Sequence, residues 1–352
     1  MKTSVLVTAA NGNTGYPAAK ELLRLGHAVR AFVRNPNTVK AKDLEASGAE
    51  LFVGDVQDIR DLRKALIDID SAYFVPTYPN VLFQGTTFAI AAREVELDHV
   101  VCLSQWLSSP EHPSIYTQAH WRVDELIKNL PKTNWTMLNP GLFGFTYFMT
   151  PHVLAQLGMF PDFGKNAPPS SEDIGLVAAH ILHDPTPHQY LTYRVTGKEV
   201  LDAMAMAQII GEELGRKIKI SPLPEWLMFK VFRAYGYPQI DASQVKYYVK
   251  EGALNTWIHQ APSSTVKDIV GKEPDDFRSL VRRYLLSHPI AEQNWSNWWK
   301  AQFFMMKVML TPSWKMDQFE RQQHFPKFQH MHLSGASNTW LQRHQIQYST
   351  TS

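Results

Sequence analysis

Two hydrophobic patterns alternate along the first 140 residues. Short runs rich in β-branched and aromatic residues are typical of buried parallel strands. Six such runs occur, namely SVLVTA, AVRAFVR, AELFVGD, SAYFVPT, HVVCLS and WTMLNP. Helical stretches lie between them, including residues 16–25, 58–66, 84–96 and 119–130. Because this alternation requires right-handed crossovers, we predict an α/β fold with a doubly wound parallel sheet.

The pattern changes after Pro140. Ser170 and Asp173 have capping-box spacing at the start of a helix that extends to residue 182. The elements predicted next are a strand at 192–197, a helix at 200–214, a strand at 217–223 and helices at 225–235 and 242–251. We expect these segments to form a smaller C-terminal α/β lobe over the carboxyl ends of the strands, where such sheets bind ligands. The predicted domain spans residues 1–288, with a sheet core of about 1–150 and a substrate lobe of about 151–288.

Residues 289–352 form a mostly helical extension in this prediction, and they hold half of the ten tryptophans. Aromatic and methionine residues recur there at helical spacing, with two lysines among them. The residues concerned are Trp295, Trp298, Trp299, Phe303, Met306 and Leu310, with Lys300 and Lys307. Such a helix could pack on its own domain or across a homodimer, lie in a membrane interface, or dock a partner protein. Its apolar run, about ten residues long, is too short to span a bilayer.

Composition narrows the class of protein. Hydrophobic residues make up 44% and charged residues 19%, which is typical of a globular chain. The net charge of +2 gives no argument for nucleic-acid binding. The single cysteine, Cys102, excludes a disulfide framework, and the histidines form no short metal-ligand pattern, so we predict no metal site. One cysteine and a first strand too short for a signal-peptide core indicate a cytoplasmic protein.

The segment VTAANGNTG, between the first strand and the first helix, predicts a dinucleotide-binding loop. Gly12 and Gly15 occupy two of the three glycine positions that allow a tight turn and close approach to a pyrophosphate, and Ala9 occupies the first. We expect the alanine to be tolerated with a negative φ. The remaining cofactor candidates in this loop are Thr8, Ala10, Asn11, Asn13 and Thr14.

The ends of later strands supply further cofactor candidates at the same edge of the sheet. Arg34 follows the second strand, where an NAD site would place an acidic residue, and its guanidinium suits a 2′-phosphate. The sequence therefore favours NADP(H) over NAD(H). The candidates at the third, fourth and sixth strands are Asp55 and Val56, Pro76 and Thr77, and Asn139, Pro140 and Gly141.

Several of these segments together resemble the NmrA-like family of atypical short-chain dehydrogenase/reductases. They are NGNTG, VRNP, GDVQD and WTMLNPGLF, followed by SSEDIGLVAAHIL, YRVTGKEVLDAMAMAQIIGEELGRKIKI and GKEPDDFRSLVRRYL. The resemblance covers residues 3–286. It implies a Rossmann fold with a small C-terminal lobe and NADP(H) binding. Members of the family divide into NAD(P)H-dependent reductases of quinones or related carbonyl compounds, and redox sensors that regulate a partner.

Carbonyl reduction needs an acid near the acceptor oxygen. Short-chain dehydrogenases use a tyrosine and a lysine four residues later, with a serine nearby; here Tyr116 has the tyrosine spacing, His120 takes the lysine position, and Ser104 ends the fifth strand. Protonated, His120 would support a tyrosinate and bind ribose hydroxyls. Phe143 and Phe145, in an aromatic segment after Gly141, suit the wall of a pocket for a flat substrate.

Three hypotheses follow, of which the third is a membrane-peripheral form of the first that takes lipid quinone through the extension. The first is an NADP(H)-dependent reductase of a quinone or small carbonyl compound, with a proton supplied by Tyr116 or by water. The alternative is a non-catalytic NADP(H) sensor that binds a protein partner through the small lobe or the extension.

Overall fold

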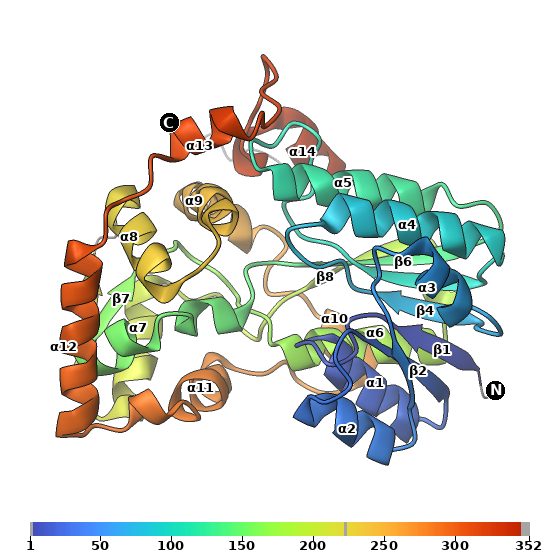
Figure 1. Ribbon diagram of the computed structural model, residues 1–352, viewed down its shortest axis with the longest axis horizontal. Helices are drawn as coiled ribbons and strands as arrows, with labels where there is room; N and C mark the ends of the chain where they lie inside the picture. Colours follow the sequence, from blue (N-terminus) through green and yellow to red (C-terminus); the bar gives the residue numbers. More distant parts are fainter. Residues whose placement is uncertain (1–2, 222–223, 346–352) are drawn as a thin grey trace.

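The computed structural model, which describes residues 3–221 and 224–345, contains a seven-stranded parallel sheet (Figure 1). Its strand order is β3–β2–β1–β4–β5–β6–β8, so the predicted doubly wound sheet is confirmed. The strands are β1 (Ser4–Val7), β2 (Ala28–Val33), β3 (Glu50–Val53), β4 (Ser71–Phe74), β5 (His99–Leu103), β6 (Asn134–Pro140) and β8 (Leu191–Val195). The strand order reverses between β1 and β4, and ligands of such sheets bind beside that point.

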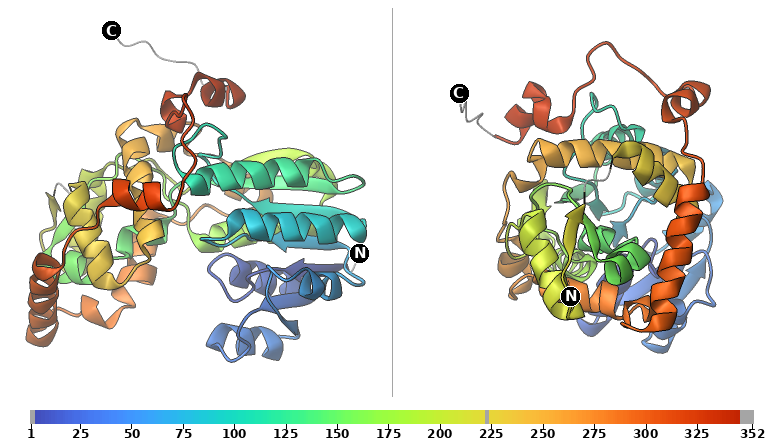
Figure 2. Two further views of the ribbon diagram at one scale, coloured as in Figure 1. Left: turned by 45° about the horizontal axis from the view of Figure 1, so that its top comes forward. Right: turned by 90° about the vertical axis from the view of Figure 1, so that its left-hand side faces the viewer.

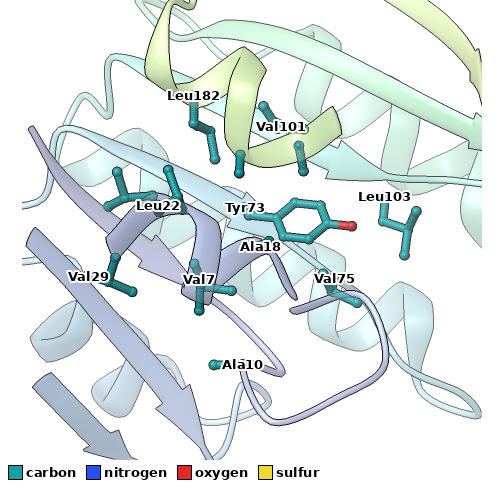
Figure 3. Close-up of a cluster of buried hydrophobic side chains, with 14 of the residues drawn as sticks. Val7, Ala10, Ala18, Leu22, Val29, Tyr73, Val75, Val101, Leu103 and Leu182 are labelled. Carbon is teal, nitrogen blue, oxygen red and sulfur yellow. The ribbon is translucent and has the colours of Figure 1, made fainter. Parts of the chain in front are cut away.

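Helices cover both faces of the sheet (Figure 1). One face is packed by α1 (Gly15–Arg24), α2 (Val39–Ala46), α6 (Ser171–His183) and α10 (Thr265–Val270). The other is packed by α3 (Ile59–Ala65), α4 (Val81–Glu94) and α5 (Ile115–Lys128). Figure 3 shows part of the first core, where Leu22 of α1 and Leu182 of α6 lie over Val7, Tyr73 and Val101 of the strands. Burial on both faces explains why the central strands β1, β4 and β5 are continuous apolar runs.

The structure corrects the position of two elements that the sequence assigned to the smaller lobe. The predicted strand at 192–197 is β8, which pairs with β6 in the main sheet. The helix that starts at residue 171 is α6, which packs against α1. Gly175 allows this approach, because a Cβ there would lie 2.6 Å from the carbonyl oxygen of Thr14. The sheet layer is therefore completed by residues beyond the proposed boundary at about 150.

The smaller lobe lies at the carboxyl end of the sheet (Figure 1). It contains α7 (Ala203–Leu214), α8 (Glu225–Tyr235), α9 (Gln239–Ala253) and α11 (Phe277–Leu280), and the parallel pair β7 (Met159–Pro161) and β9 (Lys219–Ser221). Shorter helical turns in the same region are η1 (Gly144–Phe148), η2 (His152–Gln156), η4 (Thr256–Ile258) and η5 (Val281–Leu286). The predicted strand at 217–223 is thus confirmed over 219–221, and its last two residues lie outside the described residues.

The C-terminal extension is mostly helical, as predicted, and follows the outside of the lobe back to the sheet layer (Figures 1 and 2). Its helices are α12 (Trp295–Leu310), α13 (Met316–Gln322) and α14 (Asn338–Arg343). One face of α12 packs on α8, where Val308 meets Val231 and Ala234. In α14, Trp340 lies edge-on against Trp106, with ring centroids 5.1 Å apart. The extension therefore contacts both parts of the molecule.

A buried carboxylate fastens this extension. Glu251, near the end of α9, is fully buried and contacts the Nε2 of His112 at 3.0 Å. Its oxygens also accept hydrogen bonds from the Thr256 hydroxyl at 2.5 Å, from the backbone N–H of Gly335 at 3.1 Å and from that of Ser334. One side chain therefore connects the segment before α5, the lobe and the extension.

No helix within residues 3–221 and 224–345 combines the length and the apolar character needed to cross a membrane.

Candidate cofactor and substrate site

The loop between β1 and α1 is held by its own backbone. The N–H of Gly12 donates to the carbonyl oxygen of Ala9 at 2.8 Å. A Cβ would lie 2.9 Å from that oxygen at Gly12 and 2.3 Å at Gly15, so neither position has room for a side chain. Among the described residues, no side chain caps the first turn of α1. In that turn Pro17 has no N–H, and the N–H groups of Tyr16 and Ala18 donate to the carbonyl oxygens of Gly12 and Thr14 at 3.2 and 3.3 Å. The backbone N–H of Gly15 is left for an anionic ligand such as a diphosphate.

Ala9 departs from expectation. Its φ is +47°, in the left-handed region, so the expected negative φ is wrong. The turn requires this conformation because the carbonyl of Ala9 must point into the loop to accept the N–H of Gly12. A left-handed conformation costs a non-glycine residue roughly 1–2 kcal/mol. The backbone of the loop is therefore strained at Ala9, where a glycine would adopt the same φ without strain.

The predicted loop residues divide into two groups. The side chains of Thr8 and Ala10 face inward: the Thr8 hydroxyl accepts from the N–H of Val75 at 2.8 Å, and Ala10 is fully buried. Asn11, Asn13 and Thr14 lie in the turn itself. Asn13 is exposed, Thr14 is buried at the start of α1, and the Asn11 amide donates to Thr38 at 3.1 Å.

The candidates for the adenosine end of a cofactor lie beside this loop. Arg34 directly follows β2, the strand next to β1. Its side chain is exposed, and it makes no hydrogen bond or ion pair with any described residue. Asp55, after β3, is also exposed and accepts the N–H of Gln57 at 3.0 Å, whereas Val56 is partly buried against the second core. Of these three residues, Arg34 carries the positive charge, and its exposed side chain can bind a phosphate.

Further along the edge, two predicted segments are firmly held. Pro76 is buried, and Thr77 is held by α4 because its N–H donates to the Gln84 side chain at 2.8 Å. Asn139 and Pro140 end β6 in buried positions, and the side-chain oxygen of Asn139 has no partner among the described residues.

A buried arginine lies behind Gly141. The Arg194 guanidinium donates to the backbone carbonyls of Asn139 at 3.2 Å and Trp257 at 2.9 Å, and it lies 4.2 Å from the centroid of the Trp106 ring. Burial lowers its pKa to about 9. A Cβ at Gly141 would approach its terminal nitrogens to 3.0 Å. The glycine thus lets the backbone at the end of β6 lie close to a positive charge.

The structure separates Tyr116 from His120. The Tyr116 hydroxyl donates to Asp241 of α9 at 2.6 Å, while the His120 Nε2 lies 3.1 Å from the Tyr78 hydroxyl. Burial lowers the pKa of the His120 imidazole to about 3, so the ring is neutral near pH 7. The protonated histidine considered from the sequence is therefore not the form that this site favours. Tyr78 lies between Tyr116 and His120: its ring stacks on that of Tyr116 with centroids 4.2 Å apart, and its hydroxyl is the one that contacts His120.

The Ser104 side chain forms a hydrogen bond to α5, the next helix along the chain. Its hydroxyl donates to Asp124 of α5 at 2.7 Å, and that of Ser108 donates to the same oxygen at 2.6 Å. Burial raises the pKa of the Asp124 carboxyl to about 6. Ser104 therefore connects the end of β5 to α5 in this structure.

A cavity of about 390 Å³ lies between the end of β6, the segment after it, and helices α8 and α9 of the lobe. Both predicted wall residues, Phe143 and Phe145, line it. The other apolar lining includes Leu142, Met149, Val153, Phe160, Leu227, Met228, Val231, Phe232 and Trp257. Its polar lining includes Tyr78, Gln105, Tyr116, Asp241, Gln244 and Tyr248.

These polar residues form a connected group, because the Tyr248 hydroxyl lies 3.5 Å from both the Tyr78 hydroxyl and Gln105. The cavity is thus apolar around most of its wall, with phenol hydroxyls and a carboxylate at one part of it. Tyr78, Asp241 and Tyr248 were not among the residues predicted from the sequence.

This chain is similar to known reductases and to a transcriptional regulator. The NAD(P)H azoreductase of Xenophilus azovorans is 25% identical over 221 residues, 61% of this chain and 75% of that protein. The NADPH-dependent quinone oxidoreductase QOR2 of Escherichia coli, solved with NADPH, has a similar fold with a TM-score of 0.69, 19% identity and coverage of 79% and 99% of the two chains. NmrA, a negative transcriptional regulator solved with NADP, has a TM-score of 0.66, 15% identity and coverage of 81% and 96%.

The model of the NmrA-like family matches residues 1–251. Because this match extends over most of the 352 residues, the chain belongs to the NmrA-like family.

Proposed function

We propose that this chain is an NADP(H)-dependent reductase that transfers a hydride to a quinone or another flat aromatic or small carbonyl acceptor. The observation that carries the proposal is the aromatic cavity, whose lining includes Pro140 and Gly141 at the carboxyl end of β6. A cofactor that extends from the α1 loop along this edge would reach the cavity with its nicotinamide. Rossmann sheets bind dinucleotides across this edge.

The cofactor assignment is supported by several features. Gly12 and Gly15 allow the tight turn of the loop, in which a Cβ would collide with the Ala9 carbonyl oxygen, and Arg34 is free to pair with a 2′-phosphate. The structural neighbours QOR2 and NmrA were solved with NADPH and NADP, respectively.

If Arg34 reads the 2′-phosphate, Arg34→Gln is expected to raise the Kd for NADPH about tenfold, because a charge-assisted hydrogen bond is lost. The Kd for NADH is expected to stay unchanged, since NADH lacks that phosphate. Titration of both cofactors by tryptophan fluorescence measures the two constants. Arg93→Gln, at an exposed position on α4, is the matched control and should change neither. Equal weakening of both cofactors would contradict the assignment.

The acceptor class is supported by the chemistry of the cavity wall. Aromatic side chains such as Phe143 and Phe145 suit a flat ring, and the hydroxyls of Tyr78 and Tyr116 suit an acceptor oxygen. NADPH, when bound, supplies the hydride, and reduction of a quinone to a hydroquinone also consumes one proton. The Tyr116 hydroxyl has one proton, which it donates to Asp241 in this structure. To hydrogen-bond a bound acceptor oxygen or pass a proton toward it, this hydroxyl turns from the carboxylate to the acceptor.

The direct test follows NADPH absorbance with purified protein and 1,4-naphthoquinone. Consumption above the protein-free rate is expected, and Tyr116→Phe should lower kcat/KM about tenfold because it removes one hydrogen bond to the acceptor. Tyr190→Phe is the matched control, since Tyr190 precedes β8 at the opposite end of the sheet. Equal rates in the two variants would remove Tyr116 from the reaction.

A second function is favoured by one observation. The neutral His120 lacks the positive charge that a lysine would supply beside the tyrosine, which suits a protein that binds the dinucleotide without turning it over. We propose an NADP(H)-sensing regulator of a partner protein as the alternative. A fluorescence change on adding NADPH, with no consumption in the presence of quinones or azo dyes, would support this alternative and contradict the reductase.

We further propose a cytoplasmic location. The single cysteine, Cys102, is fully buried, and burial raises the pKa of its thiol. A lone inert thiol suits a reducing compartment. Fractionation of the producing cells would test this.

A further inference from the structure

Helix α12 carries an apolar face that nothing in the described structure covers. The opposite face is buried on α8 and η2 through Asn297, Ala301 and Val308. The outward face carries Trp295, Trp298, Trp299, Phe303, Met306, Met309 and Leu310. Three of these are exposed by 71% (Trp295), 59% (Phe303) and 78% (Leu310), whereas such side chains are normally withdrawn from water. The helix lies at the outer edge of the lobe (Figures 1 and 2).

The aromatic residues on this face form one continuous group. The Trp295 and Trp298 rings stack with centroids 5.3 Å apart, and Trp299 packs edge-on against Trp298 at 4.9 Å. Phe303 continues the row one turn later, 5.9 Å from Trp299. The face is therefore a patch along the helix, rather than a scatter of single exposed side chains.

The charges on α12 itself have one sign, and the neighbouring acidic side chains, Glu292 and Glu225, lie beyond the ends of the helix. Residues 295–310 contain no Asp or Glu, and Lys300 and Lys307 lie on the same flank of the helix. The neighbouring helix α8 adds Lys230 and Arg233, whose side chains donate to the backbone carbonyls of Met309 and Pro312 at 2.8 and 3.1 Å. Lysine and arginine beside a row of tryptophans match the headgroup region of an anionic membrane, where aromatic rings insert and cations face the phosphates.

We propose that α12 lies flat in the interface of an anionic phospholipid bilayer. A second protein chain is the weaker occupant on grounds of area. A helix of 16 residues is about 24 Å long and about 10 Å wide, so its face offers roughly 240 Å², against about 800 Å² per partner in a stable interface. A bilayer demands no shape complementarity, and an interfacial helix of this length binds through apolar area and charge.

This arrangement places the cavity near the membrane. Leu227 and Val231 of α8 belong to the cluster that packs α12, and both also line the cavity. Only one helix therefore separates the apolar patch from the interior of the cavity. The inference concerns membrane binding and stands independently of the reductase proposal.

The test is flotation of the full-length protein with vesicles of phosphatidylcholine alone or mixed with phosphatidylserine. The protein is expected to float with the mixed vesicles, with a partition coefficient at least about tenfold higher than with phosphatidylcholine alone, because lysines near an anionic surface add to binding. The combined variant Trp295→Ser, Trp299→Ser and Phe303→Ser is expected to lose about a hundredfold, since three rings no longer enter the bilayer.

The matched control carries Val39→Ser and Met204→Ser, which replace exposed apolar side chains on α2 and α7 and should leave flotation unchanged. Thermal unfolding of both variants verifies the fold. Sedimentation equilibrium of each protein without lipid gives the oligomeric state. Equal flotation of the patch variant and wild type, or no flotation of wild type, would overturn the proposal. A wild-type dimer that the patch variant converts to monomer, without lipid binding, would assign the face to a second copy instead.

Discussion

Replacement of Glu251 by alanine is expected to lower the free energy of unfolding by about 3–5 kcal/mol. Glu251 is fully buried and accepts hydrogen bonds from His112, Thr256, Ser334 and Gly335. Without the carboxylate, three fully buried donors and the part-buried N–H of Gly335 lose their acceptor, and the buried ones stay away from water. Chemical denaturation followed by tryptophan fluorescence measures the loss.

Glu225→Ala is the matched control, because Glu225 pairs with Lys250 at 3.1 Å with both side chains about half exposed. An exposed pair of this kind contributes less than about 1 kcal/mol. The Glu251 variant should also become sensitive to proteolysis after residue 310, since the segment around Ser334 loses its attachment to the lobe. A loss no larger than that of the control would show that the buried carboxylate does not fasten the extension.

The second large effect is expected on cofactor binding. Gly15→Ala should weaken NADPH binding by at least about a hundredfold, since its Cβ would lie 2.3 Å from the carbonyl oxygen of Ala9 and must displace the turn on which we propose that the diphosphate lies. Alanine is the better helix former at the start of α1, so any loss comes from the clash and not from helix propensity. Isothermal titration with NADPH gives the Kd.

Ala9→Gly, the opposite change in the same turn, provides the control. Glycine adopts the φ of +47° without strain, so this variant should retain NADPH affinity and a fold at least as stable as the wild type. Unchanged NADPH affinity in Gly15→Ala would mean that the diphosphate does not lie on this loop.

The centre of the sheet was predictable because β1, β4, β5 and β6 are buried on both faces and therefore read as apolar runs, whereas the edge strand β3 is partly exposed. The position of β8 in the sheet could not be predicted from the sequence. Its partner β6 lies about 50 residues earlier, and the inserted lobe segments between them carry the same kinds of pattern, so local periodicity could not assign the strand. The pairing of β6 with β8, for example of Leu138 with Tyr193, shows that the sheet continues after the lobe residues 144–161. The contact of α6 with α1 shows the same for the helical layer.

The candidate site residues could be proposed from the sequence where they directly follow strands of the sheet. The loop glycines, Arg34 and Phe143 all follow strands of the sheet. Asp241 could not be found this way, because it meets Tyr116 across 125 residues of chain. Tyr78 lies four residues after β4 and could have been considered, since an aromatic residue at that edge is within reach of a ligand. The protonation state of His120 depends on burial, which the sequence around it does not reveal.

The attachment at Glu251 also sets an order of events during synthesis. Its partner Ser334 is 83 residues further along the chain. At translation rates of about 5–20 residues per second, Glu251 leaves the ribosome roughly 4 to 17 seconds before that partner exists. Until then the carboxylate lacks two of its donors and the extension cannot close over the lobe. The sheet can assemble on the ribosome, but the lobe that walls the cavity reaches its final form only after synthesis has passed residue 335.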